Sequence, residues 1–222
     1  MKPRDFKNAI YIEMAGMTKA LGNPHRLEIL DLLAQGPASV EYISQNTTLS
    51  VANASQHLQV LRNSKLVDTE RKGKYVYYRL ASQHVFDAWC SLRKLGFSQN
   101  AEISRLLDDY RSKNTEFETI TAEQLIDKMN QDVVVVLDVR PEEEFKTGHI
   151  KYALSYPQKN LKERMAEISK EKEIVAYCRG PLCLMADVAV KQLNKNGYKA
   201  KRLELGFPDW KAVGLPVEVS SH

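Results

Sequence analysis

The hydrophobic pattern of the chain changes near residue 110, and this change restricts the possible folds more than any other feature. Before it, apolar residues recur at helical spacing. After it, helical stretches alternate with continuous apolar runs, of which the clearest are 133–139 and 173–177. Continuous apolar strands that alternate with helices are typical of a parallel sheet with both faces covered. The sequence therefore predicts a mainly α-helical first half and an α/β second half.

The length of 222 residues accommodates two such domains. We place them at 1–110 and 111–222, with a polar linker over 110–119 at the junction. No run of 18 apolar residues is present, and the stretch MKPRDFKNAIYIEM has no apolar signal-peptide core. We therefore expect a cytoplasmic protein without a membrane partner. Its three cysteines fit a reducing compartment, in which thiols serve chemistry rather than disulfide scaffolds.

The first half contains the signals of a helix-turn-helix and a hairpin. Ser50 is placed to cap a helix over 51–64, which follows a short helix at 39–45, and Gly73 lies in a turn between two strands. The helix over 51–64 would bury one stripe, formed by Val51, Ala54, Leu58 and Leu61. Around these elements we expect helices at 5–21, 24–35 and 82–109 and strands at 66–71 and 75–80.

Polar side chains cover the other face of the helix over 51–64. Amide and hydroxyl groups with an arginine are the types that read base edges and phosphates in the major groove of DNA. The same residues would also suit a merely solvated face, and the helix alone does not decide between the two. They are Asn53, Ser55, Gln56, Gln59, Arg62 and Asn63.

The positive charge of the chain is concentrated beside this helix. Residues 51–80 hold six Lys and Arg against two acidic residues, and this excess equals the formal net charge of +4 of the whole chain. Arg71, Lys72 and Lys74 lie at the hairpin tip, where they repel one another and gain nothing in the free protein. We therefore expect a basic wing that binds the phosphates of double-stranded DNA.

Three stretches over about residues 10–95 resemble the ArsR/SmtB family of bacterial winged-helix regulators: ALGNPHRLEILDLL, LSVANASQHLQVLRNSKLV and RKGKYVYYRL. The resemblance implies a homodimer joined by its first and last helices, which binds a pseudo-palindromic operator and in most members represses transcription. By motif position it assigns base contacts to Asn53, Ser55, Gln56 and Gln59, and phosphate contacts to Arg62, Arg71, Lys72 and Lys74.

The chain departs from this family where many members bind metal. Their cysteine pair lies in a CVCDL-like motif, but this segment reads SVEYIS here, which excludes a thiolate site at that place. His84 and Asp87 have permissive spacing for a second family site, although a solvated helix start is the better explanation of them. We expect no metal and no cofactor. His57 is interpreted as a packed histidine, and Cys90 as a residue of the dimer interface.

In the second half an apolar strand leads directly into Cys178, and a helix over 184–195 follows a short loop. Such a loop directs backbone N–H groups toward the cysteine at the helix N-terminus, which favours the thiolate, and Arg179 adds positive charge. A cysteine at a strand end can also be inert. The loop favours a reactive thiol that holds sulfur as a persulfide or attacks an oxyanion.

Residues 117–217 are similar to the rhodanese, or sulfurtransferase, domains in the segments LDVRPEEEFKTGHI, IVAYCRGPLCLMADVAVKQL and LELGFPDWKAVGLPV. The resemblance implies a rhodanese-like parallel sheet with Cys178 as the acceptor of sulfane sulfur. It implies that Asp138 and Arg140 support the active site from beneath.

The cysteine loop departs from the rhodanese pattern at two positions. Cys183 occupies the place of a basic residue that is typical of active members, and Pro181 lacks a backbone N–H. Both changes weaken the case for thiosulfate turnover. Cys183 either resolves a persulfide or sulfenic acid of Cys178 into a disulfide, or is a small residue at a helix start. The sequence leaves both possibilities open.

Together the two halves predict a dimeric, DNA-binding transcriptional repressor whose operator binding weakens when sulfur or redox species modify Cys178. One alternative is a sulfurtransferase, acting on thiosulfate or a persulfide, with an appended DNA-binding domain. Another is a module that holds an anion at the cysteine loop without chemistry.

Overall fold

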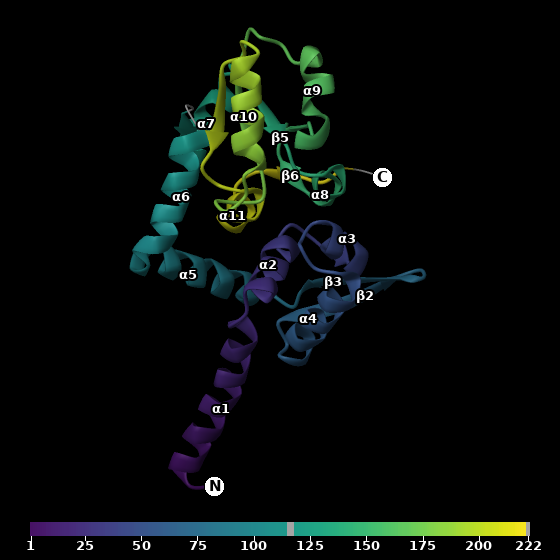
Figure 1. Cartoon of the computed structure of the whole chain (residues 1–222), viewed down its shortest axis with the longest axis vertical. Helices are drawn as coiled ribbons and strands as arrows, with labels where there is room; N and C mark the ends of the chain where they lie inside the picture. The colour runs from purple at the N-terminus through teal and green to yellow at the C-terminus, as the bar shows by residue number, and fades with distance from the viewer. Residues whose placement is uncertain (115–117, 221–222) are drawn as a thin grey trace. The chain divides into compact units, whose positions relative to one another are not determined.

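The computed structural model of the chain describes residues 1–114 and 118–220, without the side chains of 112–114. Two compact units, Met1–Ala101 and Glu102–His222, make up the chain (Figure 1). Each unit has its own hydrophobic core and is described by itself. The predicted domain boundary at 110/111 stays a prediction.

The first unit is a winged helix-turn-helix. Its elements are α1 Pro3–Leu21, α2 Pro24–Leu33, β1 Ala38–Ser39, α3 Val40–Gln45, α4 Val51–Asn63, β2 Val67–Lys72, β3 Tyr75–Leu80 and α5 Gln83–Gln99. Ser50 caps α4 as expected, since its hydroxyl accepts a hydrogen bond from the N–H of Asn53 over 3.2 Å. The hairpin of β2 and β3 turns at Gly73, whose φ of 62° lies in the left-handed region. β1 adds a third antiparallel strand.

The core of this unit contains three of the four residues expected to form the buried stripe of α4. Ala54, Leu58 and Leu61 are fully buried, but Val51 is 46% exposed, so its predicted burial is wrong. Val51 is the first residue of α4, and because helical side chains tilt toward the N-terminus, a side chain at this position extends beyond the start of the helix.

The helix predicted over 82–109 is two helices. α5 ends at Gln99, and α6, Ala101–Asn114, begins after Asn100, whose φ of −116° and ψ of 97° are extended. Because α6 runs to Asn114 and strand β4 begins at Thr119, the predicted linker over 110–119 is wrong at these places, and 115–117 lie outside the described residues. The polar residues after Tyr110 concealed only the last turn of α6, and ion pairs of Arg105 at helical spacing stabilise the part that was predicted to be helical.

The second unit is built on a five-stranded parallel sheet with the order β4-β9-β8-β5-β7. The strands are β4 Thr119–Ile120, β5 Val134–Asp138, β7 Leu154–Ser155, β8 Glu173–Tyr177 and β9 Ala200–Leu203. The helices are α7 Ala122–Asn130, α8 Glu142–Thr147, α9 Leu161–Arg164, α10 Met185–Lys195 and α11 Phe207–Ala212. β6 His149–Ile150 and β10 Val217–Glu218 form a separate antiparallel pair, and short 3-10 turns lie at Gln158–Asn160 and Met165–Glu167.

Helices cover both faces of the parallel sheet, as the apolar runs predict. Along β8, Ile174 and Ala176 pack into one core with α9 and α10, while Val175 and Tyr177 pack into the other with α7 and α11 (Figure 1). Every residue of the strand after Glu173 is therefore buried, which explains why the run is continuous rather than alternating. In the part of the chain that the structure describes, no helix is long and apolar enough to cross a membrane.

Candidate functional site

The polar face of α4 lies on the surface of the first unit. Exposed side chains are those of Asn53, Gln56, Gln59, Arg62 and Asn63, whereas Ser55 is half-buried. The opposite face packs into the core through Ala54, Leu58 and Leu61. The helix thus presents amide and guanidinium groups outward from a rigid support, as a major-groove reader requires.

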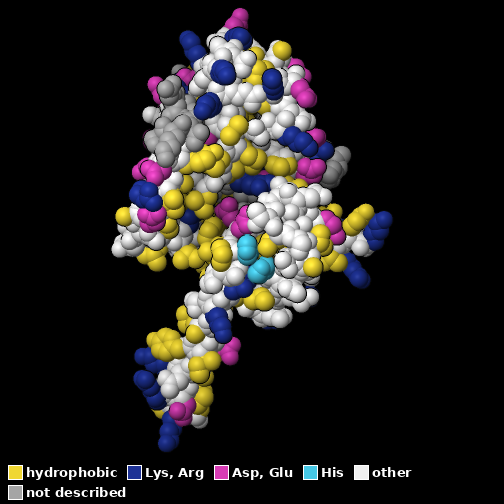
Figure 2. Space-filling model, viewed as in Figure 1, with side chains coloured by type: hydrophobic (Ala, Val, Ile, Leu, Met, Phe, Trp, Pro, Cys, Tyr) yellow, Lys and Arg dark blue, Asp and Glu magenta, His cyan; other side chains and the backbone are white. Residues whose placement is uncertain are grey.

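The wing next to α4 carries exposed cations at its tip. Arg71, Lys72 and Lys74 are all exposed, and Figure 2 shows dark blue side chains at the end of this hairpin. Nζ of Lys72 lies 3.4 Å from a carboxylate oxygen of Glu70, and Lys74 lies over the ring of Tyr75, 5.3 Å from its centroid. The premise that these cations gain nothing in the free protein is therefore wrong. Exposed pairs of this kind contribute little, so the charge remains available to phosphates.

Three residues of the first unit that drew attention in the sequence have ordinary surroundings. His84 is 97% exposed with its Nδ1 4.0 Å from Asp87, which is a solvated helix start. His57 is half-buried against His25, with ring centroids 5.5 Å apart, and burial is the largest cause that lowers its pKa. Cys90 is half-buried on α5, where a guanidinium N–H of Arg93 donates to its Sγ over 3.8 Å. Among the described residues no cluster of three His, Cys, Asp or Glu fit to hold a metal is found.

The cysteine loop, residues 178–183, joins the end of β8 to the approach of α10. Cys178 is only 3% exposed, and its thiol donates a hydrogen bond to the carbonyl oxygen of Cys183 over 3.5 Å. The N–H of Cys183 donates to the carbonyl of Gly180 over 3.0 Å, which closes a turn around Pro181. Both cysteines pack against the same core, and both are free thiols. The loop thus brings the two predicted sulfur-handling residues together.

The pKa values of the two thiols are shifted in opposite directions. Burial is the largest cause that raises the pKa of Cys178 well above its ordinary value, although backbone N–H groups of Ala186 and Gly180 oppose this. An interaction with the side chain of Cys178 is the largest cause that lowers the pKa of Cys183. Burial thus opposes the thiolate that the loop is expected to favour at Cys178, and the lower pKa of the pair belongs to Cys183.

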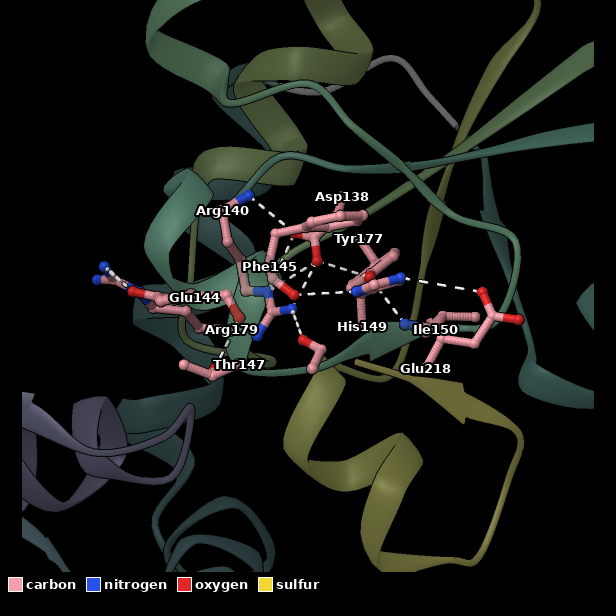
Figure 3. Close-up of polar contacts among 11 residues, drawn as sticks. Asp138, Arg140, Glu144, Phe145, Thr147, His149, Ile150, Tyr177, Arg179 and Glu218 are labelled. Carbon is pink, nitrogen blue, oxygen red and sulfur yellow. Dashed lines mark hydrogen bonds and ion pairs between the residues drawn. The ribbon is translucent and has the colours of Figure 1, made fainter. Parts of the chain in front are cut away.

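Arg179 is directed toward α8 rather than held over the cysteines. Its Nη2 lies 2.6 Å from Oε1 of Glu144, and its Nε donates to the same oxygen over 2.9 Å (Figure 3). Glu144 is 5% exposed, so this pair is largely removed from solvent. The charge of Arg179 is a smaller contribution to the lowered pKa of Cys183. Arg179 therefore anchors the loop through Glu144 and adds positive electrostatic potential at Cys183.

Asp138 and Arg140 form a buried ion pair at the ends of β5 and β8 (Figure 3). Both side chains are 0% exposed, and Nη2 of Arg140 lies 2.5 Å from Oδ2 of Asp138. Tyr177, the residue before Cys178, donates its hydroxyl to the same carboxylate over 2.6 Å, and Arg140 also donates to the carbonyl of Gly148 over 2.7 Å. Each charge is thus paired and hydrogen-bonded, and the network fixes the strand end from which the cysteine loop begins.

Sequence reasoning missed several residues that hold the loop. Glu144 and Tyr177 lie within the quoted segments, but no local signal reveals the partner of either. Gly206 packs against Gly180, and Arg111 reaches the loop from α6. The glycine in LELGFPDW was a usable signal for close backbone packing, whereas nothing in the polar stretch around 111 indicated its target.

Comparisons with known proteins match both halves. Residues 23–69 match the family described as bacterial regulatory protein, arsR family, and residues 121–213 match the rhodanese-like domain. HTH-type transcriptional regulator Rv0324 of Mycobacterium tuberculosis is 37% identical over 214 residues, which cover 96% of this chain and 94% of that protein. Transcriptional repressor SdpR of Bacillus subtilis is 34% identical over 67 residues, 30% of this chain and 74% of the relative. The solution NMR structure of the homodimeric winged helix-turn-helix DNA-binding domain (fragment 1–100) of Mb0332 from Mycobacterium bovis has 36% identity and a TM-score of 0.42, and covers 45% of this chain and 91% of that one.

Proposed function

The chain belongs to the ArsR-type transcriptional regulators and carries a rhodanese-like domain, and on this basis we propose that it is a dimeric repressor that responds to sulfane sulfur through Cys178 and Cys183. The observation that carries this proposal is the presence of two free thiols in one rhodanese-like loop, where the Cys178 thiol donates a hydrogen bond to the backbone carbonyl of Cys183. A reducing cytoplasm would keep both thiols ready to react.

DNA binding is assigned to α4 and the wing. Asn53, Ser55, Gln56 and Gln59 would read base edges, while Arg62, Arg71, Lys72 and Lys74 would contact phosphates of the operator. Repression is supported by the name of the relative SdpR, a transcriptional repressor. A second copy of the chain is supported by α1, which exposes Phe6, Ile10, Met14 and Met17 at helical spacing (Figure 2).

The sensing chemistry uses both thiols of the loop. The sulfur of Cys178, once deprotonated, attacks the outer sulfur of a small persulfide or polysulfide, which forms the Cys178 persulfide and releases the donor thiolate. The thiolate of Cys183 then attacks the inner sulfur of this persulfide. A disulfide between Cys178 and Cys183 forms, and hydrosulfide leaves with the electron pair of the broken S–S bond. The donor is thereby reduced and the protein dithiol oxidised.

The test treats the full chain with inorganic polysulfide and follows intact mass and DNA binding together. The duplex is one that the protein selects from a random-sequence library. We expect the wild type to lose two hydrogens and to release DNA, Cys183→Ser to stop at a persulfide, and Cys178→Ser to do neither. An equal DNA response of Cys178→Ser and wild type would overturn sensing at this site.

A second candidate is sulfurtransferase activity, which is favoured by the backbone N–H groups of Gly180 and Ala186 that face Sγ of Cys178. Thiosulfate would pass its outer sulfur to Cys178 with release of sulfite, and cyanide would remove that sulfur as thiocyanate. Cys183 stands where a cation would bind thiosulfate, so we expect slow turnover in the wild type and faster turnover in Cys183→Arg. Robust wild-type turnover that Cys178→Ser abolishes would favour an enzyme. A DNA response to thiosulfate that survives in Cys178→Ala would instead favour a pure anion-binding module.

A further inference from the structure

Arg111 links helix α6 to the cysteine loop. Its Nη2 donates to the carbonyl oxygen of Pro181 over 2.8 Å, and Pro181 lies between the two cysteines. In the chain, α6 follows α5 of the winged helix-turn-helix unit across the single extended residue Asn100. One guanidinium group therefore joins the helical segment that leaves the DNA-binding unit to the middle of the reactive loop.

A buried charge cluster holds Arg111 in this position. Its Nε lies 3.8 Å from Oδ1 of Asp187 in the first turn of α10, and Nε of Arg202 on β9 lies 3.6 Å from the same oxygen. Asp187 and Arg202 are 3% and 6% exposed. Within the described residues, neither carboxylate oxygen of Asp187 has a hydrogen-bond partner. Charge rather than directed hydrogen bonds therefore holds the cluster, so it tolerates small displacements of its members.

The same cluster interacts electrostatically with the reactive sulfur through Arg202. Burial lowers the pKa of Arg202, and the charges of Asp187 and, to a smaller extent, Cys178 oppose this. A negative charge that develops on Cys178 is thus attracted by Arg202, which shares Asp187 with Arg111. A change in the charge or position of Cys178 therefore acts on the partners of Arg111 as well as on its hydrogen bond to the loop.

We propose that Arg111 is a positioning residue that transmits the state of the cysteine loop to α6, an inference that rests on the proposed chemistry of Cys178 and Cys183. Formation of a disulfide draws the sulfurs of two separate free thiols to a bond of about 2.0 Å. The turn between them must tighten, and the carbonyl of Pro181 moves with it. Arg111 then loses this acceptor, and the end of α6, the helix that continues the chain from the DNA-binding unit, is released.

The test uses the full-length wild type, Arg111→Met, Arg111→Lys and the control Arg105→Ala. Met keeps the length of the side chain without a donor, and Lys restores one donor for Pro181. Arg105 lies on α6 and pairs within that helix, with Glu102 and Asp109. Each protein is treated with inorganic polysulfide, and disulfide content by intact mass, affinity for the selected duplex and hydrogen exchange of 102–114 are measured.

We expect wild type and Arg105→Ala to form the disulfide, lose about tenfold in DNA affinity and lose protection in α6. Arg111→Met should form as much disulfide as the wild type, but its affinity for DNA should change by less than about twofold on treatment. In this variant α6 should lack protection from hydrogen exchange even before treatment. Arg111→Lys should recover part of the response. A merely structural role of Arg111 would not separate disulfide formation from DNA release in this way.

The possible failures are distinguishable. Absence of both persulfide and disulfide in the wild type would overturn the proposed function itself. A normal disulfide with an equal DNA response in Arg111→Met and wild type would overturn the role of Arg111 and leave the proposed function standing. A wild-type disulfide without any DNA response would overturn both sensing and transmission. If Arg111→Met does not fold, the comparison of Arg111→Lys with Arg105→Ala decides. A DNA response of Arg111→Lys as large as that of Arg105→Ala would contradict the need for the guanidinium group.

Discussion

Gly206 lies directly against Gly180, so that a Cβ atom built on Gly206 would be 2.3 Å from the Cα of Gly180. The next residue, Phe207, donates its N–H to the carbonyl of Cys178 over 3.0 Å. The start of α11 therefore packs on the backbone of the cysteine loop, and the absence of a side chain at Gly206 is what allows this approach.

Gly206→Ala should displace the cysteine loop. The added methyl group meets backbone atoms that cannot rotate away, and we expect a loss of about 1–3 kcal/mol in the free energy of unfolding of the second unit, as in other overpacked sites. Alkylation of the buried Cys178 by iodoacetamide should become faster. Urea unfolding and mass spectrometry measure the two effects. Gly16→Ala is the control, because nothing lies within 4 Å of its added Cβ; unchanged Cys178 reactivity in Gly206→Ala would contradict the packing argument.

Asp138→Asn should strongly destabilise the second unit. It leaves the fully buried guanidinium of Arg140 without its charge partner, and breaking one member of a buried pair costs about 3–5 kcal/mol. Lys146→Ala removes the exposed pair with Glu142 and should cost less than about 1 kcal/mol. Urea unfolding compares the two variants, and similar small losses in both would show that the pair does not hold this strand end.

Much of the fold was predictable because its signals are local. The cap at Ser50, the turn at Gly73 and the apolar run that ends at Tyr177 each depend on a few neighbouring residues. The extension of α6 to Asn114 was not predictable from apolar periodicity, because the residues that follow Tyr110 in this helix are all polar.

The residues of the cysteine loop were predictable from the sequence, but their protonation and their distant contacts were not. Cys178 and Cys183 share one loop, so the sequence places them together, but which thiol keeps the proton depends on burial that only the fold determines. The contacts of Gly206 with Gly180 and of Arg111 with Pro181 join residues far apart in the chain. Gly206 could indicate a close approach of two backbones, but no pattern of neighbouring residues identifies the partner in either contact.

Replacing Lys72 and Lys74 together with Ala should weaken DNA binding on all sequences alike. Each lost phosphate contact should flatten the dependence of log K on log salt by about 1. Gln56→Ala should instead relax the preference at one base pair while leaving the salt slope unchanged. Fluorescence anisotropy at several salt concentrations tests this, with Lys191→Ala on the surface of α10 as the control. If none of these variants alters binding, the winged-helix surface is not the DNA-binding surface.

Ile10→Asp on α1 should dissociate the proposed dimer. The side chain is 43% exposed in the single chain and lies on the same helix face as Phe6, Met14 and Met17, where a buried charge would be unpaired against a second copy. Sedimentation velocity should show a monomer, and DNA affinity should fall because the two half-sites are no longer bound together. Lys7→Asp, a change of charge on the same helix, is the control. A dimer that persists in Ile10→Asp would place the interface elsewhere.

Cys178→Ala should raise the pKa of Cys183. The hydrogen bond donated by the Cys178 thiol is the largest cause that lowers this pKa, and Ala removes the donor. The thiolate fraction of Cys183 at a given pH then falls, so its alkylation rate profile should shift to higher pH. Iodoacetamide labelling of Cys183 across pH 6–10, read by peptide mass spectrometry, measures the shift. Cys178→Ser is the matched control, since its hydroxyl keeps a donor and should leave the profile closer to that of the wild type. A profile in Cys178→Ala that moves to lower pH would mean that Cys178, not Cys183, carries the thiolate of the reduced pair.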